Sequence, residues 1–119
     1  MAGIKVIRPS ERYKGAVQST NMAREAGVSE ETAGATTIWS GFVTTPPGAT
    51  SGVHHHGDCE SAIYVISGRV RFSWGDKLQY AQECGPGDFL FVPRKTEHRL
   101  RNTSTAQAEV LILASKGAL

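Results

Sequence analysis

The stretch GATSGVHHHGDCESAIYVISG, residues 48–68, decides how this chain folds and what chemistry it can carry. Three of the four histidines stand together in it, at positions 54 to 56, and Glu60 follows. The next run, 62–66, is too short for a helix and is rich in β-branched and aromatic residues, which predicts a strand. The fourth histidine, His98, lies in a second segment, GPGDFLFVPRKTEHRLRN. We interpret the two segments as neighbouring strands that bring imidazoles to one metal ion.

The spacing of His54 and His56 supports this interpretation. Alternate side chains of a strand point to the same face, so these two imidazoles project together while His55 points away. Imidazoles hold a divalent metal at about 2.0–2.2 Å, and a third ligand from another strand would close one side of the coordination sphere. Positions left to water or substrate would make such a centre reactive. A solvated histidine loop is the alternative, and the presence of the second segment favours the metal.

Length and composition predict one all-β domain. The 119 residues suit a single domain, and thirteen glycines and five prolines fall between short apolar runs. This pattern predicts many short strands and tight turns, as in a sandwich or barrel. The formal net charge of only +2, with no basic block, gives no electrostatic reason to expect nucleic acid or an anionic membrane as a partner.

We expect a cytoplasmic protein. No apolar run approaches the roughly 20 residues of a transmembrane helix. The first twelve residues also lack the apolar core of a signal peptide. Cys59 and Cys84 are too few for a disulfide framework. Cys59 lies beside the proposed site, where a small packed side chain is a better interpretation than a metal ligand.

The order of the segments predicts nine or ten strands and almost no helix. Ile4–Ile7 is expected to be a first strand, and Met22–Ala26 one helical turn that ends at Gly27. Residues 36–45 form a strand by composition, with Trp39 and Phe42 on opposite faces unless Gly41 marks a bulge. Further strands are expected at 53–56, 62–66, 69–74, 77–82, 89–92, 96–101 and 110–113. We expect residues 1–35 to form a strand-and-loop arm and 36–114 the barrel.

The two segments together resemble the motifs of the cupin superfamily. The first family motif runs Gly, five residues, His-x-His, three or four residues, Glu, six residues, Gly. It is matched by Gly48, His54, His56 and Glu60, while seven residues instead of six separate the glutamate from Gly68. The second motif runs Gly, five residues, Pro-x-Gly, two residues, His, three residues, Asn. It is matched by Gly87, Pro93, His98 and Asn102, with Lys95 in place of the inner glycine.

The resemblance covers roughly residues 36–114 and implies a small antiparallel jelly-roll barrel with a metal in its mouth. The ligands that it implies are His54, His56, Glu60 and His98. Counting back from Gly68 places Ser61 at the glutamate position and also moves the first ligand position towards His55. A slip of one residue moves a side chain to the other face of a strand. Either a local bulge turns Glu60 inward, or the centre consists of three histidines. The forward spacing from the first glycine favours His54 over His55.

Such a centre leaves two or three coordination positions open. With Fe(II) it suits a substrate oxygen and O2 side by side, and with Mn(II), Ni(II) or Zn(II) it suits polarisation of a carbonyl. We expect first a non-haem dioxygenase that acts on a small organic substrate with Fe(II). The alternatives are a metal-dependent isomerase or lyase on a sugar or a keto or hydroxy acid, and a non-catalytic module that binds a small molecule. Nothing in the sequence selects the metal.

Several side chains are candidates for the pocket. Tyr64 is a candidate proton donor if Glu60 turns inward, because both then share a face. The candidate wall consists of inward aromatic residues, about half of which are expected to be plain core: Trp39, Phe42, Tyr64, Phe72, Trp74 and Phe91. We also expect a homodimer, because an open barrel leaves strand edges that need cover and the segment Ile4–Ile7 can supply a strand to a second copy.

Overall fold

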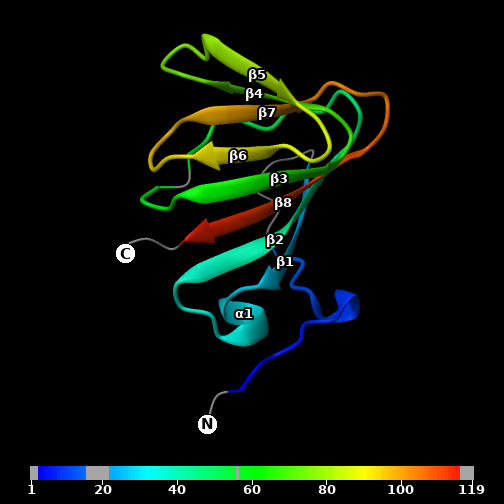
Figure 1. Ribbon diagram of the computed structural model, residues 1–119, viewed down its shortest axis with the longest axis vertical. Helices are drawn as coiled ribbons and strands as arrows, with labels where there is room; N and C mark the ends of the chain where they lie inside the picture. Colours follow the sequence, from blue (N-terminus) through cyan, green and yellow to red (C-terminus); the bar gives the residue numbers. More distant parts are fainter. Residues whose placement is uncertain (1–2, 16–21, 56, 116–119) are drawn as a thin grey trace.

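The computed structural model describes residues 3–15, 22–55 and 57–115. In these residues it has eight strands, one 3-10 helix and one short α-helix (Figure 1). Their bounds are η1 (Pro9–Glu11), β1 (Ala23–Val28), α1 (Glu30–Ala33), β2 (Ile38–Thr45), β3 (Ser61–Ser67), β4 (Val70–Trp74), β5 (Tyr80–Cys84), β6 (Phe89–Val92), β7 (His98–Asn102) and β8 (Ala108–Ser115).

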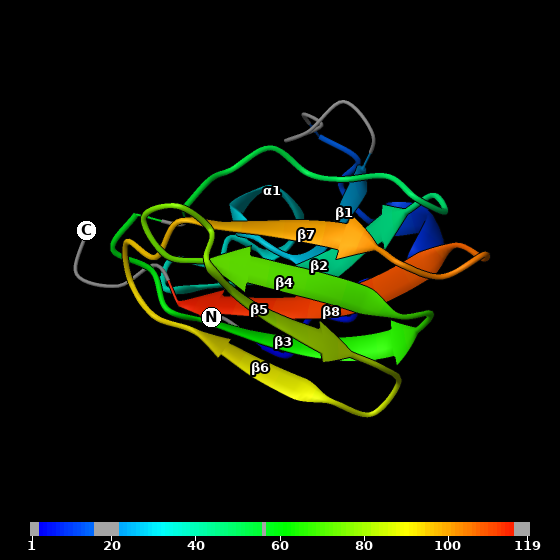
Figure 2. The ribbon, with the colours of Figure 1, turned by 90° about the horizontal axis from the view of Figure 1, so that it is seen from above.

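The strands form two antiparallel sheets of a jelly roll, as the sequence predicts. The larger sheet has the order β1-β2-β8-β3-β6, and the smaller has the order β5-β4-β7. Figure 2 shows the smaller sheet from above, in front of the larger one. Neighbouring strands that are far apart in the chain, such as β2 and β8 or β4 and β7, confirm the barrel-like connectivity.

Alternation along the strands places the core between the two sheets. On β3, Ser61, Ile63 and Val65 are buried, while Ala62 and Ile66 are exposed. Each fully buried aliphatic or aromatic side chain contributes about 1.5–3 kcal/mol relative to exposure. The core cluster consists of Val43, Ile63, Val65, Val70, Phe72, Cys84, Val92, Leu100, Ala108 and Val110.

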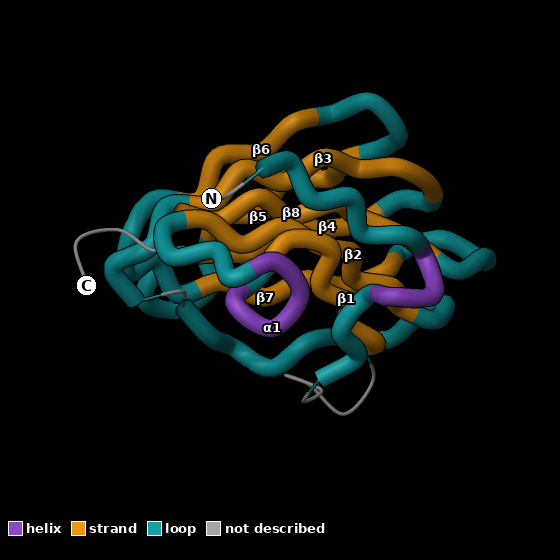
Figure 3. Tube along the Cα trace, turned by 90° about the horizontal axis from the view of Figure 1, so that it is seen from below, coloured by secondary structure: helices purple, strands orange, loops and turns teal. Residues whose placement is uncertain are grey.

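The arm before the barrel differs from the prediction. Ile4–Ile7 is not a strand, and Ile4 is 98% exposed. The expected helical turn at Met22–Ala26 is wrong, because most of it belongs to β1, where Ala23 to Ala26 pair with β2. This pairing with another strand outweighs the weak helical preference of the segment. The α-helix lies later, at α1, where it packs beside β1 (Figure 3).

Two other expected strands, at 53–56 and 77–82, also differ in their bounds, and the boundaries of the remaining strands agree to within two residues. The expected strand at 53–56 is reduced to a single bridge between His54 and His98. The strand expected at 77–82 begins only at Tyr80, because Leu78 adopts a φ of 52° and its N–H donates to the Gly75 carbonyl in a turn. Within the described ranges, neither helix has the length and apolar character needed to cross a membrane.

The prediction that Trp39 and Phe42 lie on opposite faces of β2 is confirmed. Gly41 does not mark a bulge, since the ladder from β2 to β8 runs without a shift from Ile38 to Thr45. The irregularity lies instead on β1, between Ala26 and Val28.

Candidate metal centre

Two histidines from distant parts of the chain meet inside the barrel. The N–H of His54 donates to the His98 carbonyl at 3.0 Å, and the N–H of His98 donates to the His54 carbonyl at 2.9 Å. Their ring centroids lie 4.4 Å apart, and both rings line a cavity of about 50 Å³. His98 is buried at the start of β7, while His54 is half-buried in the loop before β3. The bridge therefore holds two imidazoles at one point of the interior.

Backbone carbonyls orient both rings. Nδ1 of His54 lies 2.9 Å from the Gly52 carbonyl oxygen, and Nδ1 of His98 lies 2.8 Å from that of Thr96. Because a carbonyl can only accept, each Nδ1 carries the proton, and the neutral ring then has its lone pair on Nε2. Metal-binding histidines are commonly held in this way by a carbonyl on the second nitrogen. The donor set of this pair therefore fits a divalent metal ion.

The electrostatic environment keeps His98 neutral. Burial lowers the pKa of His98, the hydrogen bond to the Thr96 carbonyl partly opposes this, and the nearby His54 and His55 lower the pKa further. A neutral imidazole is the form that binds a metal, since a protonated ring has no lone pair to donate.

The other two histidines of the triplet, His55 and His56, are not seen to join this pair in the described residues. His56 lies outside the described residues, so its predicted role as a ligand stays a prediction. His55 is exposed, and its Nδ1 accepts a hydrogen bond from the Gly57 N–H at 2.9 Å. Over the described parts of the chain, no three His, Cys, Asp or Glu side chains converge to hold a metal. The pair therefore requires a further ligand.

Glu60 does not join the pair. It is exposed, and its backbone carbonyl accepts from the Ser115 N–H at 3.0 Å. Ser61, only 1% exposed, occupies the inward position next to it. Pairing of β3 with β8 runs without a shift from Ser61 to Val65, and the hydrogen bond from Ser115 extends it to Glu60, so the glutamate faces away from the buried serine. In the described residues Glu60 therefore stands apart from the histidine pair, and the three-histidine arrangement, which needs His56, stays a prediction.

Tyr64 also points away from the cavity. It shares the outer face of β3 with the exposed Ala62, and its ring packs against Phe89 with 4.7 Å between centroids. The expectation that it donates a proton near the metal depended on an inward Glu60, and the structure offers neither side chain to the cavity.

The cavity wall is mostly aliphatic. It consists of Met22, Arg24, Val43, Ser51, His54, Ile63, Phe72, His98, Leu100, Val110 and Ile112. Of the aromatic residues expected in the wall, Phe72 lines this cavity. Phe42 lies on the outer face of β2 with the Arg12 guanidinium 4.6 Å over its ring. Phe91 and Trp74 line a second, wider cleft of about 670 Å³, which shares Phe72 and His98 with the first.

Arg24 was not among the residues predicted to line the site. This residue pairs with the buried Val43 across β1 and β2 and therefore faces the interior. Its guanidinium lies 4.1 Å over the ring of Trp39 and lines the same cavity as the two histidines. No local signal reveals it, because a residue assigned to a helical turn cannot be placed on a face of a sheet. Trp39, which was expected to line the cavity, is not part of its wall and packs against the Arg24 guanidinium instead.

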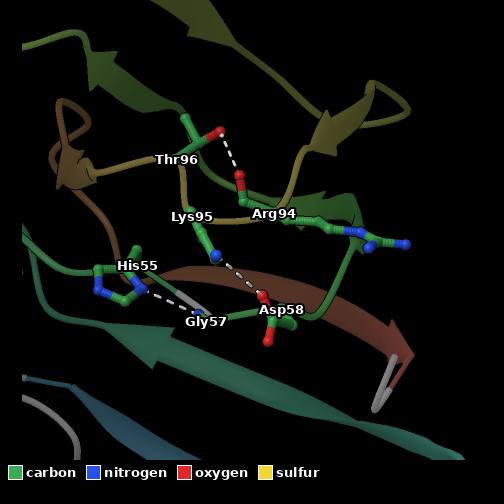
Figure 4. A network of polar contacts seen from close by, with 6 residues as sticks. All are labelled: His55, Gly57, Asp58, Arg94, Lys95 and Thr96. Carbon is green, nitrogen blue, oxygen red and sulfur yellow. Dashed lines mark hydrogen bonds and ion pairs between the residues drawn. The ribbon is translucent and has the colours of Figure 1, made fainter. Parts of the chain in front are cut away.

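The loop after the histidines is tied to the turn between β6 and β7. The N–H of Lys95 donates to the Gly57 carbonyl at 2.7 Å, and its ammonium pairs with Asp58 at 3.4 Å, as Figure 4 shows for the ion pair. Lys95 stands where the second motif usually has glycine, and it keeps a φ of 54°. A non-glycine residue in this conformation costs roughly 1–2 kcal/mol. Lys95 thus adopts a left-handed backbone conformation that glycine adopts more readily.

Comparison with known proteins agrees with this geometry. Residues 41–114 match the family model described as "Cupin domain". Protein SchB of Streptomyces halstedii is 31% identical over 80 residues, which are 67% of this chain and 56% of SchB. The chain thus spans a little over half of that relative's length.

Two solved structures share the fold. The polyketide cyclase RemF of Streptomyces resistomycificus has a TM-score of 0.78 at 20% identity, with 95% of this chain and 80% of RemF covered. KdgF of Halomonas sp. has a TM-score of 0.76 at 18% identity, with 95% and 94% covered.

Proposed function

The chain belongs to the cupin family, and from this premise we propose that it is a metal-dependent enzyme that acts on a small organic substrate in the cavity beside His54 and His98. The observation that carries the proposal is the backbone bridge between these residues, which places two carbonyl-anchored imidazoles 4.4 Å apart against one cavity. His56 is proposed as the third ligand, by its spacing from His54.

The protein's own residues would prepare the site in two ways. The Gly52 and Thr96 carbonyls hold the rings through Nδ1, so that Nε2 of each would be the atom that coordinates a metal. The largely apolar wall would strengthen electrostatic interactions inside the cavity, because it has a lower polarity than water. A bound divalent ion would supply Lewis-acid polarisation of a substrate oxygen, or a place for O2 if the ion is iron.

The reaction class that we propose first is that of a non-haem Fe(II) dioxygenase. An all-imidazole donor set with open positions is the arrangement that supports it. The second candidate is a reaction without O2, such as a cyclisation, isomerisation or lyase reaction with Zn(II), Mn(II) or Ni(II). The fold shared with RemF, whose name describes a polyketide cyclase, favours this candidate.

Metal content tests the centre itself. Protein purified without added metal is analysed for its elements, together with His54→Ala, His98→Gln and the control His55→Ala, whose ring is exposed and bonded to Gly57. We expect about one ion per chain in the parent and the control, and a strong loss in the other two. Equal metal content in all four proteins would exclude this centre.

Oxygen dependence separates the reaction classes. After anaerobic reconstitution with Fe(II), O2 uptake is screened with small aromatic and keto-acid substrates. Uptake that disappears in His98→Gln supports the dioxygenase. Turnover that needs the metal but proceeds without O2 supports the second candidate, and ligand binding that survives complete metal removal without any turnover supports a binding module.

We also propose that two copies associate through the outer face of the larger sheet. Phe91 on β6 and Leu113 on β8 both pair with Ala62 of β3, so they form one apolar row, and they are 64% and 48% exposed. Exposed apolar rows of this kind mark interaction surfaces. Light scattering after size exclusion should show a dimer for the parent and a monomer for Phe91→Lys. A monomeric parent protein would refute the proposal.

A further inference from the structure

We propose that Arg24 is the anion-binding residue of the cavity, so that the ligand carries a carboxylate facing this guanidinium. The inference deepens the proposed function and rests on it, because it concerns the cavity beside His54 and His98. It adds a chemical class for the substrate: a small carboxylic acid in its ionised form.

The position of Arg24 is set by the fold. Its register opposite Val43 turns the side chain into the barrel, while the next residue, Glu25, faces outward and pairs with Arg12 and Lys14. The guanidinium carbon lies over Trp39, 4.1 Å from the centroid of its ring. Gly41 provides the room for this stack, because a Cβ at that position would lie 2.7 Å from the Trp39 ring.

The charge of Arg24 has no protein counterpart in the cavity. Burial lowers the pKa of Arg24, yet the group keeps its charge at any physiological pH. Among the residues that the structure describes, no carboxylate forms an ion pair with it, and the cavity wall contains neither Asp nor Glu. The stack on Trp39 offsets only part of the lost hydration, since such contacts contribute about 0.5–2 kcal/mol.

A ligand carboxylate would complete this arrangement. The planar guanidinium presents parallel N–H donors that match the two oxygens of a carboxylate, whereas a neutral amide offers one acceptor and no charge. A divalent ion at the histidines would add positive charge to the same space. With Glu60 outside the cavity, no described carboxylate would compete with the ligand for either group. The cavity volume of about 50 Å³ restricts such a ligand to a few non-hydrogen atoms.

The test compares propionate with propionamide, which have the same shape and differ in charge. Each is titrated into ¹⁵N-labelled protein, both metal-free and Zn(II)-loaded, and chemical shifts are followed by NMR with the Trp39 indole N–H as reporter. We expect saturable shifts around the cavity with propionate and at least tenfold weaker binding of propionamide. This comparison uses the unaltered protein and does not depend on whether a variant folds.

Variants then assign the effect. Arg24→Gln should weaken propionate binding at least tenfold, Arg24→Lys should weaken it less, and Trp39→Leu should weaken it several-fold because the guanidinium loses its support. Arg71→Gln is the matched control, since Arg71 is exposed on the outer side of β4 and should leave the affinity unchanged.

The outcomes separate this inference from the metal proposal. Equal affinity for acid and amide, or propionate binding unchanged in Arg24→Gln, would overturn the role of Arg24 even if the histidines bind one metal. Charge-selective binding that depends on Arg24 in a protein without metal affinity would support the anion site and remove the metal centre instead. Metal content should be unchanged in Arg24→Gln.

Discussion

The last residue of the second motif, Asn102, is predicted to stabilise the fold and to have no part in metal binding. It is fully buried at the end of β7. Its side-chain amide donates to the carbonyls of Thr45 at 2.9 Å and Ala106 at 2.8 Å. Its oxygen accepts from the N–H and hydroxyl of Ser104 at 2.9 and 2.6 Å. One side chain therefore joins β2, β7 and the turn that precedes β8.

Asn102→Ala removes these four hydrogen bonds. A hydrogen bond contributes about 0.5–1.5 kcal/mol net, and a buried polar group left without its partner costs roughly 1–3 kcal/mol. The bonds to Ser104 lie partly at the surface and water can replace them, so the loss should come mainly from the two carbonyls. We expect the free energy of unfolding to fall by about 3–5 kcal/mol.

Asn102→Asp is a more specific test. It keeps the shape of the side chain but replaces the amide group, which donates two hydrogen bonds, by a carboxylate oxygen that faces the two carbonyls. It should destabilise the protein at neutral pH at least as much as the alanine variant, since a buried charge without a partner is costly. Urea unfolding followed by tryptophan fluorescence measures both, with Thr105→Ala in the same exposed turn as control. A loss below about 1 kcal/mol for either variant would refute the reasoning.

Three further predictions concern other parts of the barrel. Gly68→Ala should lower the free energy of unfolding by roughly 2–5 kcal/mol in calorimetry, because φ is 79° and the added Cβ would lie 2.8 Å from the Ala108 backbone; an unchanged melting temperature would contradict this. In metal-free protein, the free energy of unfolding should be highest above the unfolded-state pKa of histidine, about 6.5, and should decrease below it. The reason is that the unfolded chain then binds a proton that buried His98, with its lowered pKa, does not bind. Urea unfolding between pH 5 and 8 should show this decrease, and His98→Gln should make it smaller. Burial raises the pKa of the Cys84 thiol, so Cys84 should react with iodoacetamide more slowly than the partly exposed Cys59, and mass spectrometry showing the reverse order would contradict this placement.

Features that depend only on residues within one short segment could be predicted from the sequence. The alternation of buried and exposed residues along β3 from Ser61 to Ile66, and the turns at Gly68 and Gly75, follow from a local pattern of period two and from glycines with positive φ. The meeting of His54 with His98 was also predictable, but through the two family motifs rather than through any local property.

The face of each residue near a strand end was not predictable. Glu60 and Ser61 are adjacent, and only the register of β3 against β8 decides that the serine is buried while the glutamate is exposed. The same applies to Tyr64, which was expected to face the cavity together with Glu60. Its ring packs against Phe89 instead. A shift of one residue exchanges the two faces, and a single chain segment contains no information on its register with a distant strand.

Local composition alone determined that this chain would form short antiparallel strands with its histidines beside an apolar run. Tertiary pairing decided the contents of the cavity, because it turned residues 23–28 into a strand and placed Arg24 between Val43 and Trp39. The physical reason is that burial and charge compensation depend on neighbours far away in the chain, whereas strand preference and turn geometry depend on neighbours a few residues away.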